Sequence, residues 1–282
     1  MPVLATQRLS PLASLPAVLT QMFPPIYLEE MEQVALLNRV ETKYIFHFDT
    51  LLQLLPTLGS TYRVLTVADQ PLARYRTLYF DTPDLALYHS HHAGALNRYK
   101  VRAREYVDSA YSFLEVKQKT NKQRTVKQRI ATPHLLTDLD ARSHAFLDGA
   151  CPFPAAALTP VLWNTYRRIT LVSVADQERV TFDIDLHFQW QNRHYTLPNL
   201  VTAEVKRTGR SQASPFVQLL HDQHVRRGGI SKYCLGVSLL YPRVKANKFK
   251  KKHRRVAKVL QGDLVPYGSP HLWGQGGTSV SH

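Results

Sequence analysis

Charged residues fall on alternate positions, two or four residues apart, in seven short segments of this chain. The segments are Arg39-Glu41-Lys43, Arg74-Arg76, Lys100-Arg102-Arg104, Glu115-Lys117-Lys119, Lys127-Arg129, Arg179-Asp183-Asp185 and Glu204-Lys206. Successive side chains of a β-strand point to opposite faces, so each set of charges falls on one side. The positions between the charges are mostly apolar, as at Val101 and Ala103. The pattern predicts strands that each have one buried face and one cationic face with few acids.

The predicted elements favour the α+β class. Strands are expected at 39–48, 63–67, 74–81, 98–107, 112–119, 125–130, 162–174, 179–186 and 201–206, and helices at 25–38, 51–58, 133–147 and 212–226. The run of strands between 63 and 130 has no intervening helix, which is typical of an antiparallel meander.

The sign of the charges bears on which way the cationic faces point. For any one strand, a solvated face of an antiparallel sheet is the ordinary explanation. Taken together, however, the residues from Arg98 to Arg129 include ten Lys or Arg and only three acids. Like charges directly opposite one another destabilise a sheet, so a solvated face normally mixes signs. We therefore expect a closed barrel with its charges inside and its apolar residues outside, covered by helices.

The composition of the whole chain points to an anionic partner. The formal net charge of +15 favours nucleic acid, an anionic membrane or phosphate-rich small molecules. Nucleic acid is the least favoured of these, because the most basic segment has few aromatic residues for base stacking. The two cysteines form no metal-ligand spacing and no disulfide framework, which predicts a reducing compartment and a cytoplasmic location. No apolar run approaches the about 18 residues of a membrane-spanning helix.

The chain divides into four predicted parts. Residues 1–24, interrupted by Pro11 and Pro16, are expected to form a flexible leader, and residues 25–242 a folded domain. Residues 243–260 form a basic segment, with nine cations between Arg243 and Lys258, and residues 261–282 are expected to be disordered. The basic segment is either a solvated tail or a contact site for a long polyanion, an anionic membrane surface or a membrane partner. If the segment contacts a membrane surface or a membrane partner, the protein would lie peripherally at a membrane.

Three acids lie among the cations of the alternating segments: Glu41, Glu115 and Glu204. One interpretation is ion pairing with neighbouring lysines. The other is a divalent cation held by one or two carboxylates and by substrate phosphates, as Mg²⁺ prefers. The two are compatible, because a carboxylate can pair with lysine without substrate and bind a metal with it.

Nine short motifs occur in an order that resembles one protein family. They are Arg39–Tyr44, Tyr79–Thr82, Asn97–Arg104, Phe113–Lys117, Val126–Arg129, Tyr166–Arg168, Arg179–Asp183, Glu204–Lys206 and Ser231–Tyr233. Together they resemble the VTC (vacuolar transporter chaperone) domain, the polyphosphate polymerase domain of the triphosphate tunnel metalloenzymes. The resemblance spans about residues 39–240.

The resemblance implies a closed eight-stranded antiparallel tunnel with flanking helices. Its basic residues would bind the triphosphate of ATP and the growing polyphosphate chain. Carried over by motif, the catalytic lining would be Lys43, Arg102, Arg104, Lys117, Lys127, Arg168, Arg179 and Lys232. Glu204 would hold a divalent cation, Mn²⁺ or Mg²⁺, with Glu41 and Glu115 as further metal candidates. Other cations of the alternating segments, Lys100, Arg129, Lys206 and Arg76, are predicted to bind substrate. Only one of Arg167 and Arg168 can point inward, and we select Arg168.

The implied activity is a metal-dependent phosphotransferase that extends polyphosphate from ATP. The triphosphatase and cyclase branch carries Glu-x-Glu-x-Lys on its first strand, whereas this chain has Arg39 at the first Glu position, which favours the polymerase branch. Gly229 stands where eukaryotic members have a lysine. The alternatives are a triphosphatase that uses the same tunnel and a non-catalytic module that binds polyphosphate.

Overall fold

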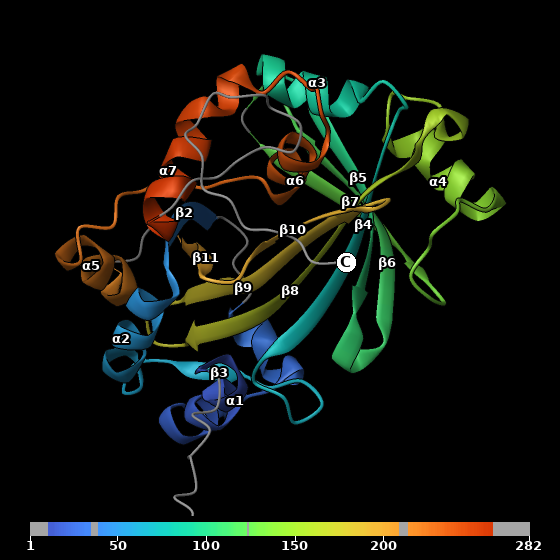
Figure 1. Ribbon diagram of the computed structural model, residues 1–282. Helices are drawn as coiled ribbons and strands as arrows, with labels where there is room; N and C mark the ends of the chain where they lie inside the picture. The colour runs from blue at the N-terminus through green and yellow to red at the C-terminus, as the bar shows by residue number, and fades with distance from the viewer. Residues whose placement is uncertain (1–10, 35–38, 123, 209–213, 262–282) are drawn as a thin grey trace, which may run out of the picture.

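The computed structural model describes residues 11–34, 39–122, 124–208 and 214–261 (Figure 1). Its strands are β1 (Pro25–Ile26), β2 (Arg39–His47), β3 (Arg63–Leu65), β4 (Ala73–Asp81), β5 (Arg98–Tyr106), β6 (Tyr111–Lys119), β7 (Thr125–Thr132), β8 (Thr159–Ser173), β9 (Glu178–Trp190), β10 (Arg193–Leu197) and β11 (Leu200–Thr208). Its α-helices are α1 (Pro11–Met22), α2 (Phe48–Leu58), α3 (Ala86–Ala93), α4 (Ala141–Ala150), α5 (Pro215–Asp222), α6 (Lys232–Leu240) and α7 (Lys250–Leu260). Short 3₁₀ helices span Leu28–Val34, Val107–Ser109, Ala155–Ala157 and Asn247–Phe249.

Eight strands form one antiparallel sheet in the order β2-β11-β9-β8-β4-β5-β6-β7. The α+β class and the eight-stranded antiparallel order are therefore confirmed. Among the strands that the structure describes, no pairing joins β7 back to β2, so closure of the tunnel stays a prediction.

The alternation expected from the sequence sorts the sheet into two faces. The apolar positions between the charges lie on one side, which we call the outer face, and most are fully buried, as at Val101, Leu114, Phe182 and Val205. Helices α1, α2 and α5 contribute to the core on one part of this face, and α4 packs on β6 in another. Figure 1 shows helices around the periphery of the strands. The opposite side, the inner face, carries the predicted cations.

Helix α6 packs against one end of the inner face. Its residues from Tyr233 to Leu240 are all buried, and they share a hydrophobic cluster with Ile45, Tyr79 and Leu162 of the strands. A Cβ atom at Gly236 would lie 2.6 Å from side-chain atoms of both Leu162 and Phe188, so only glycine allows this close approach. The Ser231 hydroxyl caps the helix by accepting the Cys234 N–H.

The structure corrects the expectation for the N-terminal region. Residues 11–22, predicted to belong to a flexible leader, form helix α1, whose Leu15 and Leu19 are completely buried in the core beside α2. Pro11 begins the helix, where a missing N–H costs nothing. The helix expected over 25–38 is replaced by strand β1 and a 3₁₀ helix over Leu28–Val34, while residues 35–38 lie outside the described part of the chain. The rest of the predicted leader, residues 1–10, and the predicted disordered tail beyond 261 also lie outside it.

The basic segment is helical from Asn247 to Leu260. Residues 247–249 form a 3₁₀ turn that leads directly into α7, and α7 packs against β2 and β11. Phe249 and Val256 anchor it in the same cluster as α6. Within the described residues, no helix combines the length and the apolar character needed to cross a membrane.

Candidate functional site

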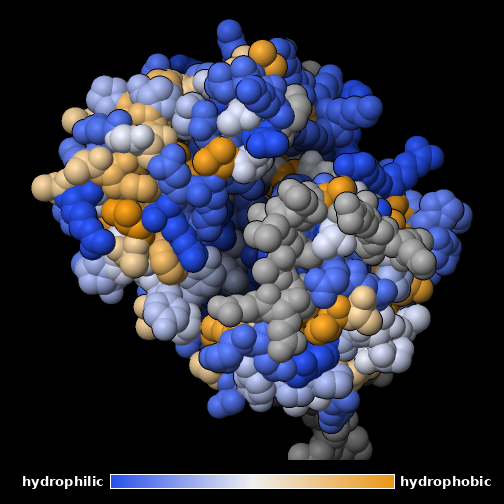
Figure 2. Space-filling view, turned by 180° about the vertical axis from the view of Figure 1, so that it is seen from behind, coloured by the Kyte–Doolittle hydropathy of each residue, from blue (hydrophilic) through white to orange (hydrophobic). Residues whose placement is uncertain are grey.

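Strand register brings most of the predicted cations together on the inner face. Residues paired directly across neighbouring strands lie on the same side of a sheet. The pairs on this face include Arg102 with Glu115, Lys100 with Lys117, Lys117 with Lys127, Arg129 with Glu115, Lys43 with Glu204, Lys206 with Arg179, and Arg168 with Asp183. The view in Figure 2 shows a hollow near the middle of one side of the molecule, lined by hydrophilic residues.

Charged side chains from strands at or near opposite ends of the sheet order interact with one another. Lys117 on β6 interacts electrostatically with Lys43 and Glu41 on β2 and with Glu204 on β11. Burial and then the Lys43 charge lower the pKa of Lys117 to about 8. Burial also lowers the pKa of Lys100 to about 8, with Arg102 and Lys43 among the cations that contribute. Cations of β2, β5 and β6, which lie at or near opposite ends of the sheet order, therefore act on one another across the inner face.

Two carboxylates of the inner face meet at the Lys43 ammonium. The Lys43 Nζ atom lies 2.5 Å from Glu41 Oε1 and 2.6 Å from Glu204 Oε2, and the other Glu204 oxygen contacts Lys206. Burial opposes ionisation of Glu204, but the Lys206 and Lys43 charges outweigh it and hold its pKa well below the usual range. Glu204 is therefore a carboxylate at neutral pH.

The donor set at this point fits a hard divalent cation. Mg²⁺ in phosphoryl-transfer sites is commonly held by one or two carboxylates and completes its shell with phosphates and water. Glu41 and Glu204 supply two carboxylates that already converge on one positively charged atom, the Lys43 Nζ. No group of three or more His, Cys, Asp or Glu side chains arranged for a metal ion occurs in the part of the chain that the structure describes. Further ligands would have to come from substrate and solvent.

Glu115, the third predicted metal ligand, has a different environment. It is 1% exposed, and its two oxygens contact Arg102 at 2.7 Å and Lys127. Burial would raise the pKa of Glu115, but Arg102, Arg104 and Lys127 lower it to about 2. In this structure Glu115 acts as the counter-charge of cations on β5 and β7.

Asp183 is a site residue that our sequence interpretation did not select. Its oxygens accept hydrogen bonds from Arg168 Nε at 2.5 Å and Nη2 at 2.9 Å, and the Lys232 ammonium from α6 contacts it as well. Burial is outweighed by the Arg168 and Lys232 charges, which hold the pKa of Asp183 well below its usual range. Its place in the alternating segment Arg179-Asp183-Asp185 was the signal that could have identified it.

Two tyrosines add an aromatic wall beside these charges. The rings of Tyr75 and Tyr166 stack with their centroids 5.0 Å apart. The guanidinium groups of Arg104 and Arg168 lie over both rings, at 4.9 to 5.8 Å from the centroids. Cation–π contacts hold a guanidinium in place without neutralising it, so the charge of Arg104, unlike that of Arg168 beside Asp183, stays available to an anion.

Inner-face cations that have no carboxylate partner within 4.0 Å among the described residues include Lys100, Lys117, Arg104 and Arg129. Arg104 is only 6% exposed, and its Nε donates a hydrogen bond to the neutral Thr77 hydroxyl at 3.4 Å. Buried charge without a partner is unfavourable. The site therefore has positive charge in excess of its own acids.

Arg76 is the one predicted site residue that the register places elsewhere. It pairs with Glu105 on the outer face, at 3.1 Å from Nη1 to Oε2, and its guanidinium lies over Trp163. Its side chain is 51% exposed. The prediction that it shares a face with the other cations is wrong, because inner positions on β4 are the odd-numbered Tyr75, Thr77 and Tyr79.

The two adjacent arginines of β8 separate as predicted. Arg168 turns to Asp183 on the inner face, whereas Arg167 pairs in register with Arg74 and lies 3.4 Å from Asp185. Arg129 reaches the ring of Phe113, with 4.3 Å between its Cζ atom and the ring centroid.

A buried carboxylate holds the start of α6, and with it Lys232. Asp81, at the end of β4, is completely buried and accepts backbone N–H bonds from Thr82, Leu87 and Tyr88. It also accepts the hydroxyl of Tyr233, the residue after Lys232. This network joins β4, α3 and α6, so the motif around Asp81 positions a site residue rather than contacting the site itself.

Several solved structures are similar to the structure of this protein. Similar solved structures include a candidate adenylate cyclase from Vibrio parahaemolyticus, with 14% identity and a TM-score of 0.40, covering 69% of this chain and 94% of that protein. A candidate adenylyl cyclase from Hippeastrum with a dominant triphosphatase activity has 12% identity and a TM-score of 0.42, covering 71% and 96%. The PH1819 protein from Pyrococcus horikoshii OT3 has 11% identity and a TM-score of 0.39, covering 70% and 97%.

The match to a sequence family is more specific than these similarities in structure. No curated protein matches the chain. The family model described as the VTC domain matches residues 38–241, which include every strand of the eight-stranded order and helix α6. The chain therefore belongs to the VTC domain family.

Proposed function

We propose that this protein is a metal-dependent phosphotransferase that extends polyphosphate by transferring the γ-phosphate of ATP. Phosphoryl transfer asks little covalent chemistry of a protein, and catalysis comes from positioning and charge neutralisation. A site made of arginine, lysine and a few carboxylates suits that reaction.

The excess of inner-face cations over acids is the observation that carries the proposal. Lys100 and Lys117 face each other across β5 and β6, and Lys43 adds a third ammonium from β2. Like charges brought this close and partly buried destabilise the empty protein, and a polyanion reverses that effect. A triphosphate supplies several negative charges in a row, which matches a row of cations better than a single carboxylate or phosphate does.

Each residue of the site has a proposed role in this reaction. Arg102, Arg104 and Arg168 would hold phosphate oxygens through guanidinium hydrogen bonds, which are directional and bidentate. Lys43, Lys117, Lys127, Arg179 and Lys232 would neutralise the remaining phosphate charge, with Lys100, Arg129 and Lys206 along the chain. Glu204 and Glu41 would hold Mn²⁺ or Mg²⁺, which when bound neutralises charge on the phosphates.

In the proposed transfer, a terminal oxygen of the polyphosphate chain attacks the γ-phosphorus of ATP. A new P–O–P bond forms, the bond from the γ-phosphorus to the β–γ bridging oxygen breaks, and ADP leaves with that oxygen. The inner-face cations would keep the two anions in line and lower their mutual repulsion. In a triphosphatase, water would attack at the same place and the same cations would serve.

Product analysis tests the proposal and separates it from the two alternatives. Purified protein is incubated with ATP and Mn²⁺ or Mg²⁺, and the products are resolved by gel electrophoresis and phosphate release. We expect long polyphosphate and ADP, and no turnover when EDTA is present until Mn²⁺ is restored. Free phosphate without long chains would indicate a triphosphatase. Tight binding of polyphosphate without turnover of ATP would indicate a binding module.

A further inference from the structure

Helix α7 carries a cationic surface that the candidate site does not use. Its exposed residues Lys250, Lys251, Arg254 and Lys258, which we call the α7 cationic face, lie within eleven residues of helix. The sequence from 223 to 262 contains twelve Lys or Arg residues and no Asp or Glu. The α7 cationic face therefore has no acid on its own element or on the segment that leads to it.

This arrangement is unfavourable for an isolated helix. Lys250, Lys251 and Lys252 occupy the first turn, where the positive end of the helix dipole disfavours cations. Lys250, Arg254 and Lys258 follow at a spacing of four residues, at which like charges on a helix surface repel each other. An anion on the surface would offset both effects.

The helix is nevertheless firmly attached to the domain, which argues against a solvated tail. Val256 is completely buried. The Arg255 guanidinium donates hydrogen bonds to the carbonyls of Arg226 and Arg227, and it fills the space where a Cβ at Gly228 would lie. The Gly228 N–H in turn donates to the Lys43 carbonyl at 2.7 Å. Helix α7 is thus tied through the segment 226–228 to a strand of the candidate site.

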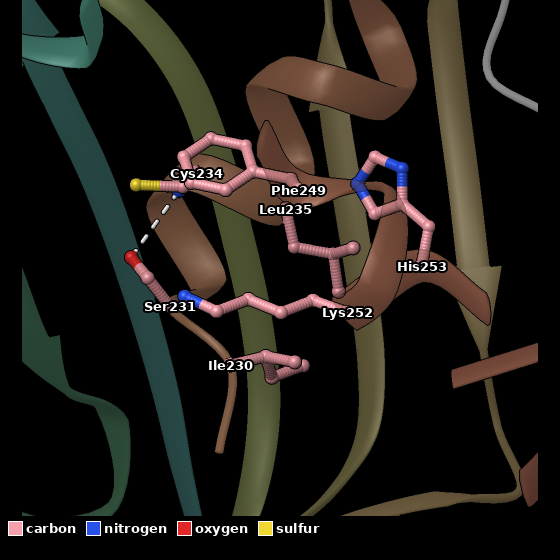
Figure 3. Close-up of a pocket in the computed structure, with 7 residues that line it drawn as sticks. All are labelled: Ile230, Ser231, Cys234, Leu235, Phe249, Lys252 and His253. Carbon is pink, nitrogen blue, oxygen red and sulfur yellow. Dashed lines mark hydrogen bonds between the residues drawn. The ribbon is translucent and has the colours of Figure 1, made fainter. Parts of the chain in front are cut away.

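Lys252, in the first turn of α7, brings positive charge from that helix toward the start of α6. It lines a small cavity with Ser231 and Cys234, and its side chain extends toward Ser231, the residue before Lys232 (Figure 3). His91 on α3 interacts with charges of both β5 and α7, and its Nε2 atom lies 2.9 Å from the Tyr99 carbonyl oxygen on β5. Burial, and then the charges of Lys100, Arg98 and Lys252, lower the pKa of His91 to about 3. Cations of β5 and of α7 therefore act on the same buried group.

We propose that the α7 cationic face binds the part of a polyphosphate chain that extends beyond the inner face, with Lys252 and Arg98 between the two. This inference rests on the proposed function for the identity of the polyanion. A chain with one negative charge per unit can follow consecutive cations from Lys100 past Lys252 onto α7. A short triphosphate bound at the inner face would not reach the helix.

The test compares long and short ligands in a variant of α7. Lys250→Gln, Lys251→Gln and Lys258→Gln are combined, since all three side chains are exposed. Binding of polyphosphate of roughly 100 units and of tripolyphosphate is measured over a series of salt concentrations. Each lost phosphate contact reduces the slope of log affinity against log salt by about 0.7, so the slope for long chains should become shallower by about 2. Affinity for long chains should fall roughly tenfold or more at low salt, and affinity for tripolyphosphate should not change.

A matched control removes the same charge elsewhere. Arg74→Gln, Arg76→Gln and Arg142→Gln lower the net charge equally on the outer face and on α4, and should leave long-chain affinity within about twofold. If the triple variant of α7 is poorly folded, the double variant Lys251→Gln with Lys258→Gln should make the slope shallower by about 1.4.

Several outcomes would overturn the inference. It fails if the affinities for long and short chains fall together, if neither changes, or if the control variant loses as much long-chain affinity. Binding to vesicles of phosphatidylcholine and phosphatidylserine is measured for the wild type and for the triple variant of α7. If the variant loses vesicle binding but keeps its affinity for long polyphosphate, the α7 cationic face is a membrane contact instead. If the wild-type protein binds long polyphosphate but not tripolyphosphate, the proposed function is contradicted, whereas the α7 cationic face would still be a polyphosphate-binding surface.

Discussion

Glu204 accepts a hydrogen bond from the Lys43 ammonium at 2.6 Å, across the register pair that joins β11 to β2. Glu41 lies 2.5 Å from the same nitrogen. Two carboxylates thus converge on one cation in the absence of substrate. The structure shows the ion pairing of these acids, and their binding of a metal ion together with a triphosphate stays a proposal.

Replacing Glu204 should separate turnover from substrate binding. Glu204→Gln removes one negative charge from the point where a divalent cation would be held, so ATP turnover with Mn²⁺ should fall by at least about 100-fold. Tripolyphosphate binding without metal should be unchanged or tighter, because Lys43 and Lys206 lose an acid partner. Steady-state kinetics and metal-free calorimetry measure the two effects.

Glu105→Gln is the matched control for this variant. Glu105 also sits on a strand and pairs with a cation, Arg76, but on the outer face. Its replacement should leave turnover within about twofold, since surface pairs contribute little. Unimpaired turnover in Glu204→Gln would exclude a metal role for that residue.

Arg102 should be sensitive even to lysine. Its Nε and Nη2 atoms lie 2.8 and 2.7 Å from Glu115 Oε2, and its neighbours on the inner face are phosphate-binding candidates. Lysine keeps the charge but loses the planar fork that matches carboxylate and phosphate oxygens. Arg102→Lys should therefore reduce kcat/KM by about tenfold or more, equivalent to one bidentate contact.

Arg76→Lys tests whether the face, rather than the residue type, determines this result. Arg76 lies on the neighbouring strand β4, opposite Glu105 and therefore three register positions from Arg102, but it faces outward. The activity of Arg76→Lys should hardly differ from that of the wild type. A substitution at the buried outer-face residue Ala103 should also reduce activity less than Arg102→Lys does. Both comparisons require variants that keep the wild-type melting temperature. Equal losses in the two arginine variants would remove the basis for the assignment.

Tripolyphosphate binding should weaken as pH rises above about 8. Lys100 and Lys117 have pKa values of about 8 in the free protein. Both ammonium groups carry full charge well below that pH and lose it above, while a bound anion favours the charged form. Affinity should fall by about tenfold per pH unit for each lysine once pH exceeds 8. Lys117→Arg stays charged and should remove about half of this dependence in titrations from pH 7 to 9.5.

The stability of the ligand-free protein should change in the opposite direction. The folded pKa of Lys117, about 8, lies below the unfolded value of about 10.4. The unfolded chain therefore binds more protons between these two values, and the free energy of unfolding rises with pH across that window. Thermal melting from pH 7.5 to 9.5 should show a smaller rise for Lys117→Arg than for wild type. An identical rise would show that Lys117 has an ordinary pKa.

Gly229 should be required for the position of Lys43. A Cβ atom there would lie 2.6 Å from Lys43 Cβ and 3.0 Å from its Cδ, so an alanine must displace the lysine or the loop. Gly229→Ala should reduce turnover by about tenfold through the loss of the Lys43 contacts with Glu41 and Glu204.

Gly149→Ala provides the control for added volume at a glycine. Gly149 lies in α4, and a Cβ there meets nothing within 4 Å. That variant should keep full activity and gain slightly in stability, because alanine favours helix more than glycine does. Full activity in Gly229→Ala would show that Lys43 can shift without consequence.

Local alternation was sufficient to predict many strands and their faces. Because the side-chain period of a strand is two, the charges at Lys100, Arg102 and Arg104 had to share one side and Val101 and Ala103 the other. The structure places them so. Helix α1 could not be predicted in the same way, because it contains two prolines and lacks charged residues in its first and last turns. Burial of Leu15 and Leu19 in the core stabilises it.

The sequence by itself determined the period of the strands, the surplus of cations and the family. Only the tertiary structure decided whether the odd-numbered or the even-numbered residues of each strand face inward. Within one strand the two sets look equivalent, and the register with the neighbouring strands fixes the choice. Arg74 and Arg76 obey the alternation yet face outward, because the register of β4 with β5 points Tyr75, Thr77 and Tyr79 inward. The contact of Lys232 with Asp183 and the approach of Lys43 to Lys117 join residues far apart in the chain. Such contacts depend on the curvature of the whole sheet, which no local pattern encodes.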